Sequence, residues 1–276
     1  MKQAQIAFIG GGNMATSLIA GLIADGYEPR RLIVSDPDRA KVDALTARFG
    51  VRTTDSNAAA IAEADTLVLC VKPQIAPAVC RGLASELGSR LSLVVSVMAG
   101  VREATITSWL GTDLPIVRAM PNTPAMLQAG AIGLHASPQA NATQRNQAET
   151  ILRAVGMVRW VADEDLIDAV TAISGSGPAY FFLLMETLEE AAVALGLPGE
   201  DARLLTIQTA LGAARMAIEG GDPPATLRER VTSPGGTTEA ALKVFADGGL
   251  GDLVARAAAA ARARAAKLSD QLTEQS

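Results

Sequence analysis

Histidine and cysteine are scarce in this chain of 276 residues, which has one histidine, His135, and two cysteines, Cys70 and Cys80. A zinc site built from several histidines is therefore excluded, and a hydrolytic triad would have to use His135. The cysteines are too far apart for a CxxC pair, so we expect free buried thiols, which are typical of a cytoplasmic protein. The sequence predicts no metal site and a cytoplasmic location.

Basic residues are also in short supply, with 24 lysines and arginines against 29 acidic residues and a net charge of −5. A nucleic-acid-binding surface needs clustered basic residues, so we expect no nucleic-acid partner. The apolar runs fall short of the ~20 residues that a membrane span needs. The run after Met1–Gln5 is typical of a strand and not of a signal peptide. We therefore expect no membrane partner.

Aromatic residues make up only 3% of the chain, while hydrophobic residues together make up 49%. The core must therefore be aliphatic and rich in alanine. In residues 1–161 short apolar runs alternate with helical periodicity, which is typical of βαβ units and a mainly parallel sheet. The predicted strands are Ile6–Ile9, Leu32–Ser35, Thr66–Val71, Leu93–Val97, Ile116–Ala119, Ile132–His135 and Val158–Val161. The predicted helices are Met14–Ala24, Arg39–Phe49, Ile75–Leu87, Glu103–Trp109 and Gln139–Val155.

The pattern changes after Asp163, because only helical periodicity follows, interrupted by clusters of glycine and proline. We therefore predict an α/β N-terminal domain in residues 1–163 and an all-α C-terminal domain in residues 164–276. Its helices are dense in alanine, and small residues let helices pack closely. We expect this half to complete its core against a partner subunit, in a homodimer or a larger oligomer.

A glycine-rich turn follows the first predicted strand directly. Gly10, Gly12 and Ala15 match the G-x-G-x-x-G/A pattern of dinucleotide-binding turns. Gly10 permits the tight turn, Gly12 lets a pyrophosphate approach the backbone, and Ala15 lets the helix pack on the strand. Because the pattern follows a strand and opens a helix, dinucleotide binding in a Rossmann-like domain is favoured over an ordinary glycine turn.

Asp36 ends the second predicted strand, where an acidic side chain can hydrogen-bond the adenosine ribose. That role would favour NADH over NADPH, because a carboxylate repels a 2′-phosphate. In the alternative interpretation, Asp36 faces solvent or caps the helix after Pro37. Arg31 and Arg39 offer a phosphate some positive charge, so the sequence leaves the choice of cofactor open.

Two further loops fall at predicted strand ends, where ligands of such sheets gather. Lys72 lies in Val71-Lys72-Pro73, and Asn122 lies between two prolines. Lys72 is either a contact to the nicotinamide or ribose or a solvated charge. Asn122 either binds the cofactor or belongs to a simple turn.

A hydroxyl-rich turn, Ser233-Pro234-Gly235-Gly236-Thr237-Thr238, precedes a predicted helix near the C-terminus. The first N–H groups of a helix lack partners within the helix, so such a turn can hold a small carboxylate or phosphate. Read alone, the segment is an N-capped turn. With a cofactor site in the same chain, it becomes a candidate clamp for a substrate carboxylate.

The chain resembles pyrroline-5-carboxylate reductases over essentially its whole length. The matching landmarks are Ile9–Met14, Val71–Pro73, Ala99–Val101, Arg118–Pro124, Ser174–Tyr180 and Val231–Thr238. The resemblance implies reduction of 1-pyrroline-5-carboxylate to L-proline with NADPH or NADH, the last step of proline biosynthesis. It also implies an N-terminal Rossmann domain, a C-terminal helical dimerisation domain, and assembly of dimers into a decamer.

The resemblance also assigns individual residues. The implied substrate contacts are Ser233, Gly235, Gly236, Thr237 and Thr238, with the Thr238 hydroxyl at the ring nitrogen as the catalytic group. The implied cofactor contacts are Gly10, Gly11, Gly12, Asn13, Met14, Ser35, Pro37, Asn57, Val71, Lys72 and Ala99, and the residue patterns described above add Asp36, Pro73 and Asn122. Two alternatives stay open: another NAD(P)-dependent imine or β-hydroxyacid dehydrogenase, and a non-catalytic nucleotide-binding module. The second domain holds only Lys243 and Lys267 as lysines, neither in a glycine-rich or polar motif, which counts against a β-hydroxyacid dehydrogenase.

Overall fold

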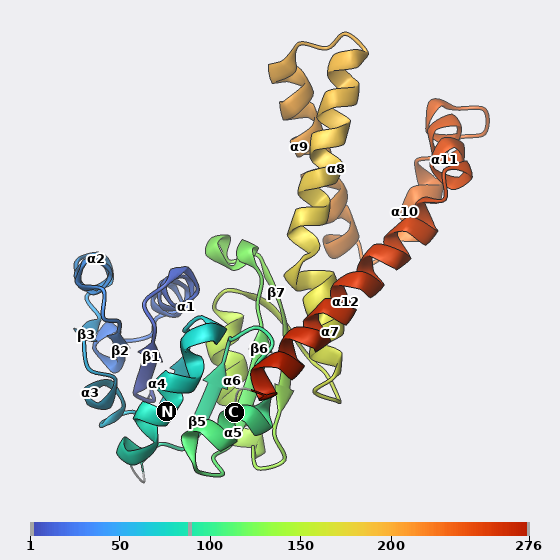
Figure 1. The fold of residues 1–276 in the computed structure, drawn as a ribbon. Coiled ribbons are helices and arrows are strands. Elements are labelled where there is room, and N and C mark those ends of the chain that lie inside the picture. Colours follow the sequence, from blue (N-terminus) through green and yellow to red (C-terminus); the bar gives the residue numbers. More distant parts are fainter. Residues whose placement is uncertain (1–2, 88–89, 275–276) are drawn as a thin grey trace. The chain divides into compact units, whose positions relative to one another are not determined.

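The computed structural model describes residues 3–87 and 90–274 and is shown in Figure 1. The chain divides into two compact units, one from Met1–Ser176 together with Ala261–Ser276, and one from Gly177–Ala260. This division places residues 164–176 and 261–274 with the first unit, whereas the boundary at residue 163 stays a prediction from the sequence. The chain passes between the units twice, once after Ser176 and once after Ala260.

The first unit is built on an eight-stranded sheet among the described residues, in the order β3-β2-β1-β4-β5-β6-β7-β8. Neighbouring strands run parallel except for the antiparallel pair β6 and β7. The strands are β1 (Ile6–Ile9), β2 (Leu32–Ser35), β3 (Arg52–Thr54), β4 (Thr66–Leu69), β5 (Leu93–Ser96), β6 (Ile116–Met120), β7 (Gly130–Ala136) and β8 (Gly156–Trp160). The predicted mainly parallel α/β fold is confirmed.

Helices bury both faces of this sheet. Along β1, Ile6 and Phe8 belong to one hydrophobic core and Ala7 and Ile9 to the other, because successive side chains of a strand point to opposite faces. Residues of α1, α2 and α6 line the first core, and residues of α3, α4 and α5 line the second. The helices are α1 (Asn13–Ala24), α2 (Arg39–Phe49), α3 (Asn57–Ile61), α4 (Ala76–Leu83), α5 (Glu103–Leu110), α6 (Ala142–Arg153) and α7 (Leu166–Val170).

The second unit is helical, as the sequence predicted. It contains α8 (Gly177–Ala194), α9 (Gly199–Glu219), α10 (Pro224–Arg230), α11 (Thr237–Asp247) and the first part of α12 (Leu250–Glu274). The last part of α12 belongs to the first unit, where Leu272 packs against one of its cores and Thr273 shares a hydrogen bond with Thr105 of α5.

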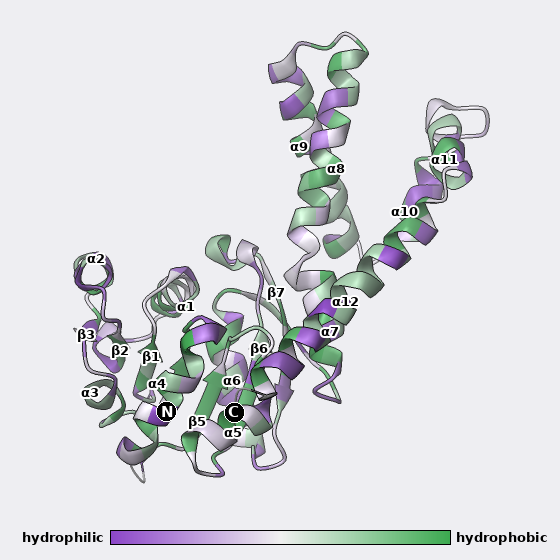
Figure 2. Cartoon of the chain, viewed as in Figure 1, coloured by the Kyte–Doolittle hydropathy of each residue, from purple (hydrophilic) through white to green (hydrophobic). Residues whose placement is uncertain are grey.

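The helical run Leu166–Ala194 is apolar enough, by length and composition alone, to cross a membrane. From the sequence we expected no such stretch. Figure 2 shows the apolar colouring along α8, and only 22% of the most apolar window is buried within the single chain. A helix that packs against a partner subunit has the same composition, so this run is weak evidence for a membrane span.

Candidate functional site

The glycine-rich turn at the end of β1 has the geometry of a dinucleotide-binding loop. Gly10 adopts a φ of +99°, and a Cβ there would lie 2.8 Å from the carbonyl oxygen of Cys70. A Cβ on Gly12 would meet no described atom within 4 Å, so the space beside it is open. Gly12 is the N-cap of α1, and no described side chain caps this helix. An uncapped helix start beside open space fits a pyrophosphate.

The strand ends that follow bring the other predicted cofactor residues to the same edge of the sheet. β1, β2, β4, β5 and β6 are parallel, so the residues after each lie at one edge. Lys72 and Ala99 are exposed there, and Val71 and Pro73 are half-buried.

Ser35 and Asn57 meet at this edge, although they are far apart in the sequence. The buried Ser35 hydroxyl donates a 2.7 Å hydrogen bond to the Asn57 Oδ1. Asn57 starts α3, whose N-cap is Ser56. Next to them Pro37 is exposed, whereas the carboxylate of Asp36 is buried and points to Gly11. The structure therefore gathers Ser35, Asn57 and the turn after β2 into one small region.

Asn122 is buried at the end of β6, and its amide makes two hydrogen bonds to the backbone. Its Nδ2 donates to the carbonyl of Ser174 at 2.9 Å, and its Oδ1 accepts from the amide of Ala131 at 2.9 Å. These bonds tie β6 to β7 and to the π-helical turn Thr171–Gly175. Asn122 thus has a structural role in addition to any contact with a cofactor.

The hydroxyl-rich turn of the second unit leads into α11 as a tight backbone loop. Gly235 adopts a φ of +71°, and the Gly236 amide donates to the carbonyl of Ser233 at 3.0 Å. Gly236 is the N-cap of α11, and no described side chain bonds to the first amides of this helix. The amides of Thr237 and Thr238 therefore lie at an uncapped helix N-terminus, which favours an anion.

Glu239 also belongs to this turn, although we did not predict it from the sequence. Its Oε2 accepts a 2.7 Å hydrogen bond from the amide of Gly235. The sequence signal was its position three residues after the N-cap, where a glutamate reaches back to the chain before the helix in a capping box. The carboxylate holds the turn in shape and also places a negative charge beside it.

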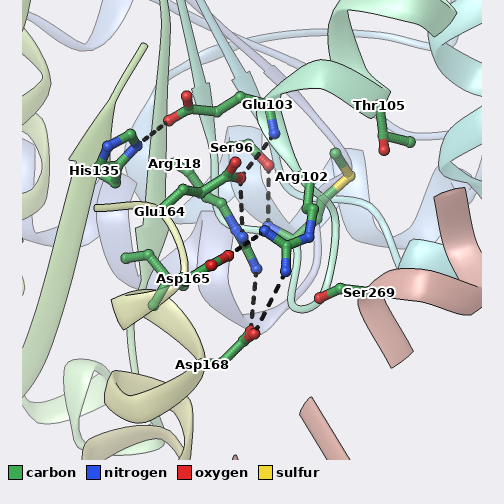
Figure 3. Close-up of polar contacts among 12 residues, drawn as sticks. Ser96, Arg102, Glu103, Thr105, Arg118, His135, Glu164, Asp165, Asp168 and Ser269 are labelled. Carbon is green, nitrogen blue, oxygen red and sulfur yellow. Dashed lines mark hydrogen bonds and ion pairs between the residues drawn. The ribbon is translucent and has the colours of Figure 1, made fainter. Parts of the chain in front are cut away.

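A cluster of charged side chains surrounds the buried Arg118 and Asp168 in the first unit, and we did not predict it from the sequence (Figure 3). The guanidinium of Arg118, on β6, lies 3.0 Å from the Glu164 carboxylate and 4.0 Å from that of Asp168. Arg102 pairs with Asp165 at 2.6 Å and with Asp168 at 3.8 Å. The feature of the sequence that could have revealed this cluster is an arginine inside the apolar strand Ile116–Met120.

Burial and charge act on this cluster in opposite directions. Burial raises the pKa of the Asp168 carboxyl above its usual value, against the lowering effect of Arg118 and Arg102. A hydrogen bond from Arg102 lowers the pKa of Asp165. Burial also raises the pKa of Glu103, which lies 2.7 Å from the Nδ1 of His135. The cluster joins β6, α5 and the base of α7, and is a structural feature of the first unit.

Comparisons with known proteins extend these observations to the whole chain. Residues 164–268 match the model of the pyrroline-5-carboxylate reductase dimerisation domain. Residues 5–100 match that of the coenzyme F420-dependent NADP oxidoreductases. A pyrroline-5-carboxylate reductase of Pseudomonas aeruginosa is 51% identical over 272 residues, which cover 99% of each chain.

Solved structures show the same similarity to pyrroline-5-carboxylate reductases. A pyrroline-5-carboxylate reductase from Coxiella burnetii has a TM-score of 0.94 and 50% identity, and the match covers 97% of this chain and 99% of that one. The Plasmodium falciparum enzyme, solved with NADP bound, has a TM-score of 0.84 and 27% identity, with 98% and 99% coverage. The likeness thus spans both units of the molecule.

Proposed function

The chain belongs to the pyrroline-5-carboxylate reductase family, and from this premise we propose how its residues carry out the reaction. The protein is an NAD(P)H-dependent oxidoreductase that reduces 1-pyrroline-5-carboxylate to L-proline, the last step of proline biosynthesis. The similarity to the Pseudomonas aeruginosa enzyme over 99% of both chains carries this conclusion. It disfavours the two alternatives, another NAD(P)-dependent imine or β-hydroxyacid dehydrogenase and a non-catalytic nucleotide-binding module.

The proposed cofactor residues lie at one edge of the sheet. The open space beside Gly12 and the uncapped start of α1 fit a pyrophosphate. In this proposal Ser35, Pro37 and Asn57 would hold the adenosine ribose, and Val71, Lys72, Pro73 and Ala99 would contact the nicotinamide half of the cofactor. Bound NADPH or NADH supplies the hydride that is added to the C=N bond.

The proposed substrate site is the turn from Ser233 to Thr238. The backbone amides at the start of α11 hold the substrate carboxylate, which fixes the position of the ring. The Thr238 hydroxyl then orients the ring nitrogen and relays its proton. Hydride addition is easier when that nitrogen is protonated, because its positive charge falls as the hydride arrives. Such a reaction needs no histidine, and His135 is engaged with Glu103 in the first unit.

A direct assay tests this function. The purified protein is mixed with 1-pyrroline-5-carboxylate and either NADPH or NADH, and the loss of absorbance of the reduced cofactor is followed. We expect turnover that depends on the pyrroline, with L-proline as the product. Binding of the nucleotide without any turnover would contradict the function and favour a binding module.

Self-association follows from the dimerisation domain in residues 164–268. We propose in addition that dimers assemble into a decamer, on the basis of the family resemblance. A cytoplasmic location is also a proposal, supported by Cys70 and Cys80, which are free thiols in the structure.

A further inference from the structure

Asp36 stands at the position where the acidic residue of a Rossmann domain ordinarily contacts the ribose, but its carboxylate points into the protein. Its Oδ2 accepts a 2.8 Å hydrogen bond from the amide of Gly11, in the glycine-rich turn. Its Oδ1 accepts a 2.9 Å hydrogen bond from the amide of Asp38, in the turn after β2. The side chain is only 9% exposed. The carboxylate therefore ties the turn after β1 to the turn after β2.

These hydrogen bonds are of the strong kind, because the acceptor carries a charge and is shielded from water. The backbone of Gly11 would otherwise leave a buried amide without a partner, which costs more than an average hydrogen bond contributes. The Gly11 site is itself tight, since a Cβ there would lie 3.2 Å from Leu45 and 3.4 Å from the Cβ of Asp36. The position of the glycine-rich turn thus depends on Asp36.

The charge of Asp36 is also balanced locally. The Nζ of Lys41 lies 3.5 Å from the Asp36 Oδ1 and 3.6 Å from the Oδ2 of Asp38. The Lys41 side chain is 47% exposed, so it can turn toward a ligand at this edge of the sheet. A phosphate on the ribose would meet an exposed ammonium group that lies 3.5 Å from the buried Asp36 carboxylate. The Lys41 charge therefore offsets part of the repulsion between Asp36 and that phosphate.

We propose that Asp36 is a positioning residue of the cofactor site, which holds the glycine-rich turn and does not select between NADH and NADPH. Lys41 supplies the positive charge that favours the 2′-phosphate of NADPH. This inference rests on the proposed function, because it assumes that the glycine-rich turn binds the cofactor. It replaces the expectation from the sequence that Asp36 favours NADH.

The test is the change of Asp36 to asparagine, with the binding of NADP+ and NAD+ measured by calorimetry. The asparagine cannot accept both hydrogen bonds, so we expect both dissociation constants to rise by about tenfold. Their ratio should stay within about twofold of the wild-type ratio. A variant that loses only NAD+ affinity, or gains NADP+ affinity, would overturn the inference.

Two further variants serve as controls. Asp38→Asn makes the same chemical change at an exposed neighbour and should leave the dissociation constant of NAD+ unchanged, because its side chain bonds to the amide of Ala40 and not to the glycine-rich turn, and NAD+ has no 2′-phosphate for Lys41 to contact. Asp36→Glu keeps the charge but misplaces it, and should weaken both nucleotides as Asp36→Asn does. Wild-type affinity in Asp36→Glu would contradict a positioning role. The melting temperature of each ligand-free variant reports whether it folds.

Lys41→Gln tests the second half of the inference. This variant should weaken NADP+ by about fivefold and NAD+ by less than twofold, because only NADP+ carries the 2′-phosphate. An equal effect on both nucleotides would overturn the assignment of Lys41. These binding data are independent of turnover. A wild-type protein that binds nucleotides but reduces no pyrroline would therefore refute the proposed function and would leave the inference about Asp36 unaffected.

Discussion

The Thr238 hydroxyl is the one side-chain group of the substrate turn to which we assign a step of the reaction. Changing Thr238 to valine keeps the shape of the side chain and removes the hydroxyl. We expect kcat to fall by about a hundredfold, because the ring nitrogen loses the group that orients it, while the affinity for NADPH stays the same. Steady-state kinetics and calorimetry measure the two effects separately.

Thr238→Ser is the matched control for that prediction. Serine restores the hydroxyl at the same position of α11, and most of the turnover should return. If Thr238→Val turns over at a near-normal rate, Thr238 has only the structural role of a residue in the first turn of a helix.

Glu239 is a second residue that affects the same turn, through its charged carboxylate. Its carboxylate accepts the hydrogen bond from Gly235, and in the proposed site its charge would repel the carboxylate of the substrate. Glu239→Gln keeps an acceptor and removes the charge, so we expect KM for pyrroline-5-carboxylate to fall roughly two- to threefold. Because exposed charges are screened, the difference from wild type should shrink as salt is added. An effect independent of salt would mean that the geometry of the turn, and not its charge, had changed.

At the scale of elements, the charged cluster joins β6 and α5 to the base of α7, and titration can test it. The pKa of Asp168 is raised in the folded protein, so its ionisation is less favourable there than in the unfolded chain. Its contribution to stability therefore falls as pH rises above the usual value of 3.8. We expect the melting temperature of Asp168→Asn, relative to wild type, to increase between about pH 3 and pH 6.

The neighbouring Asp165 offers a control of opposite sign. Arg102 lowers its pKa in the folded protein, so its ionised form contributes stability that is lost as pH falls through the lowered pKa. The melting temperature of Asp165→Asn, relative to wild type, should therefore decrease as pH rises over the same range. If both variants shift in the same direction, the environments of the two carboxyls are not as the structure describes.

The elements that the sequence predicted well are those with long apolar patterns. All seven predicted strands are present, because strands that are buried on both faces of a sheet appear in the sequence as continuous apolar runs. The edge strand β3 was missed, since Arg52–Thr54 is short and polar, and so was the five-residue helix α3. The antiparallel direction of β7 also went unpredicted, because an apolar run carries no information about direction.

The parts of the proposed site that are formed by short sequence motifs could be predicted from the sequence. The glycine pattern after β1 and the turn before α11 depend on local backbone chemistry, which glycine, proline and threonine reveal. The hydrogen bond from Gly11 to Asp36 spans 25 positions, and that from Asn122 to Ser174 spans 52. Contacts of this kind need the fold itself, so the orientation of Asp36 could not be read from the chain.

At the scale of the whole molecule, the second unit exposes many large apolar side chains, as interaction surfaces do. Phe181 and Phe182 on α8 are 64% and 63% exposed, and Leu205 and Leu211 on α9 are 57% and 52% exposed. All lie within residues 164–268, which match the dimerisation domain. Burial of this surface against a second copy explains why the run Leu166–Ala194 is apolar enough to resemble a membrane span.

The last prediction tests that explanation. Changing Phe182 to aspartate places a charge in the apolar surface, where a dimer would bury it without a partner, and that costs several kcal/mol. We expect the variant to elute as a monomer in size-exclusion chromatography with light scattering, whereas the wild type forms at least a dimer. Met126→Asp is the matched control, because Met126 is 61% exposed but lies outside residues 164–268. A dimer that survives Phe182→Asp would exclude this face of α8 from the interface and leave its apolar surface to another partner.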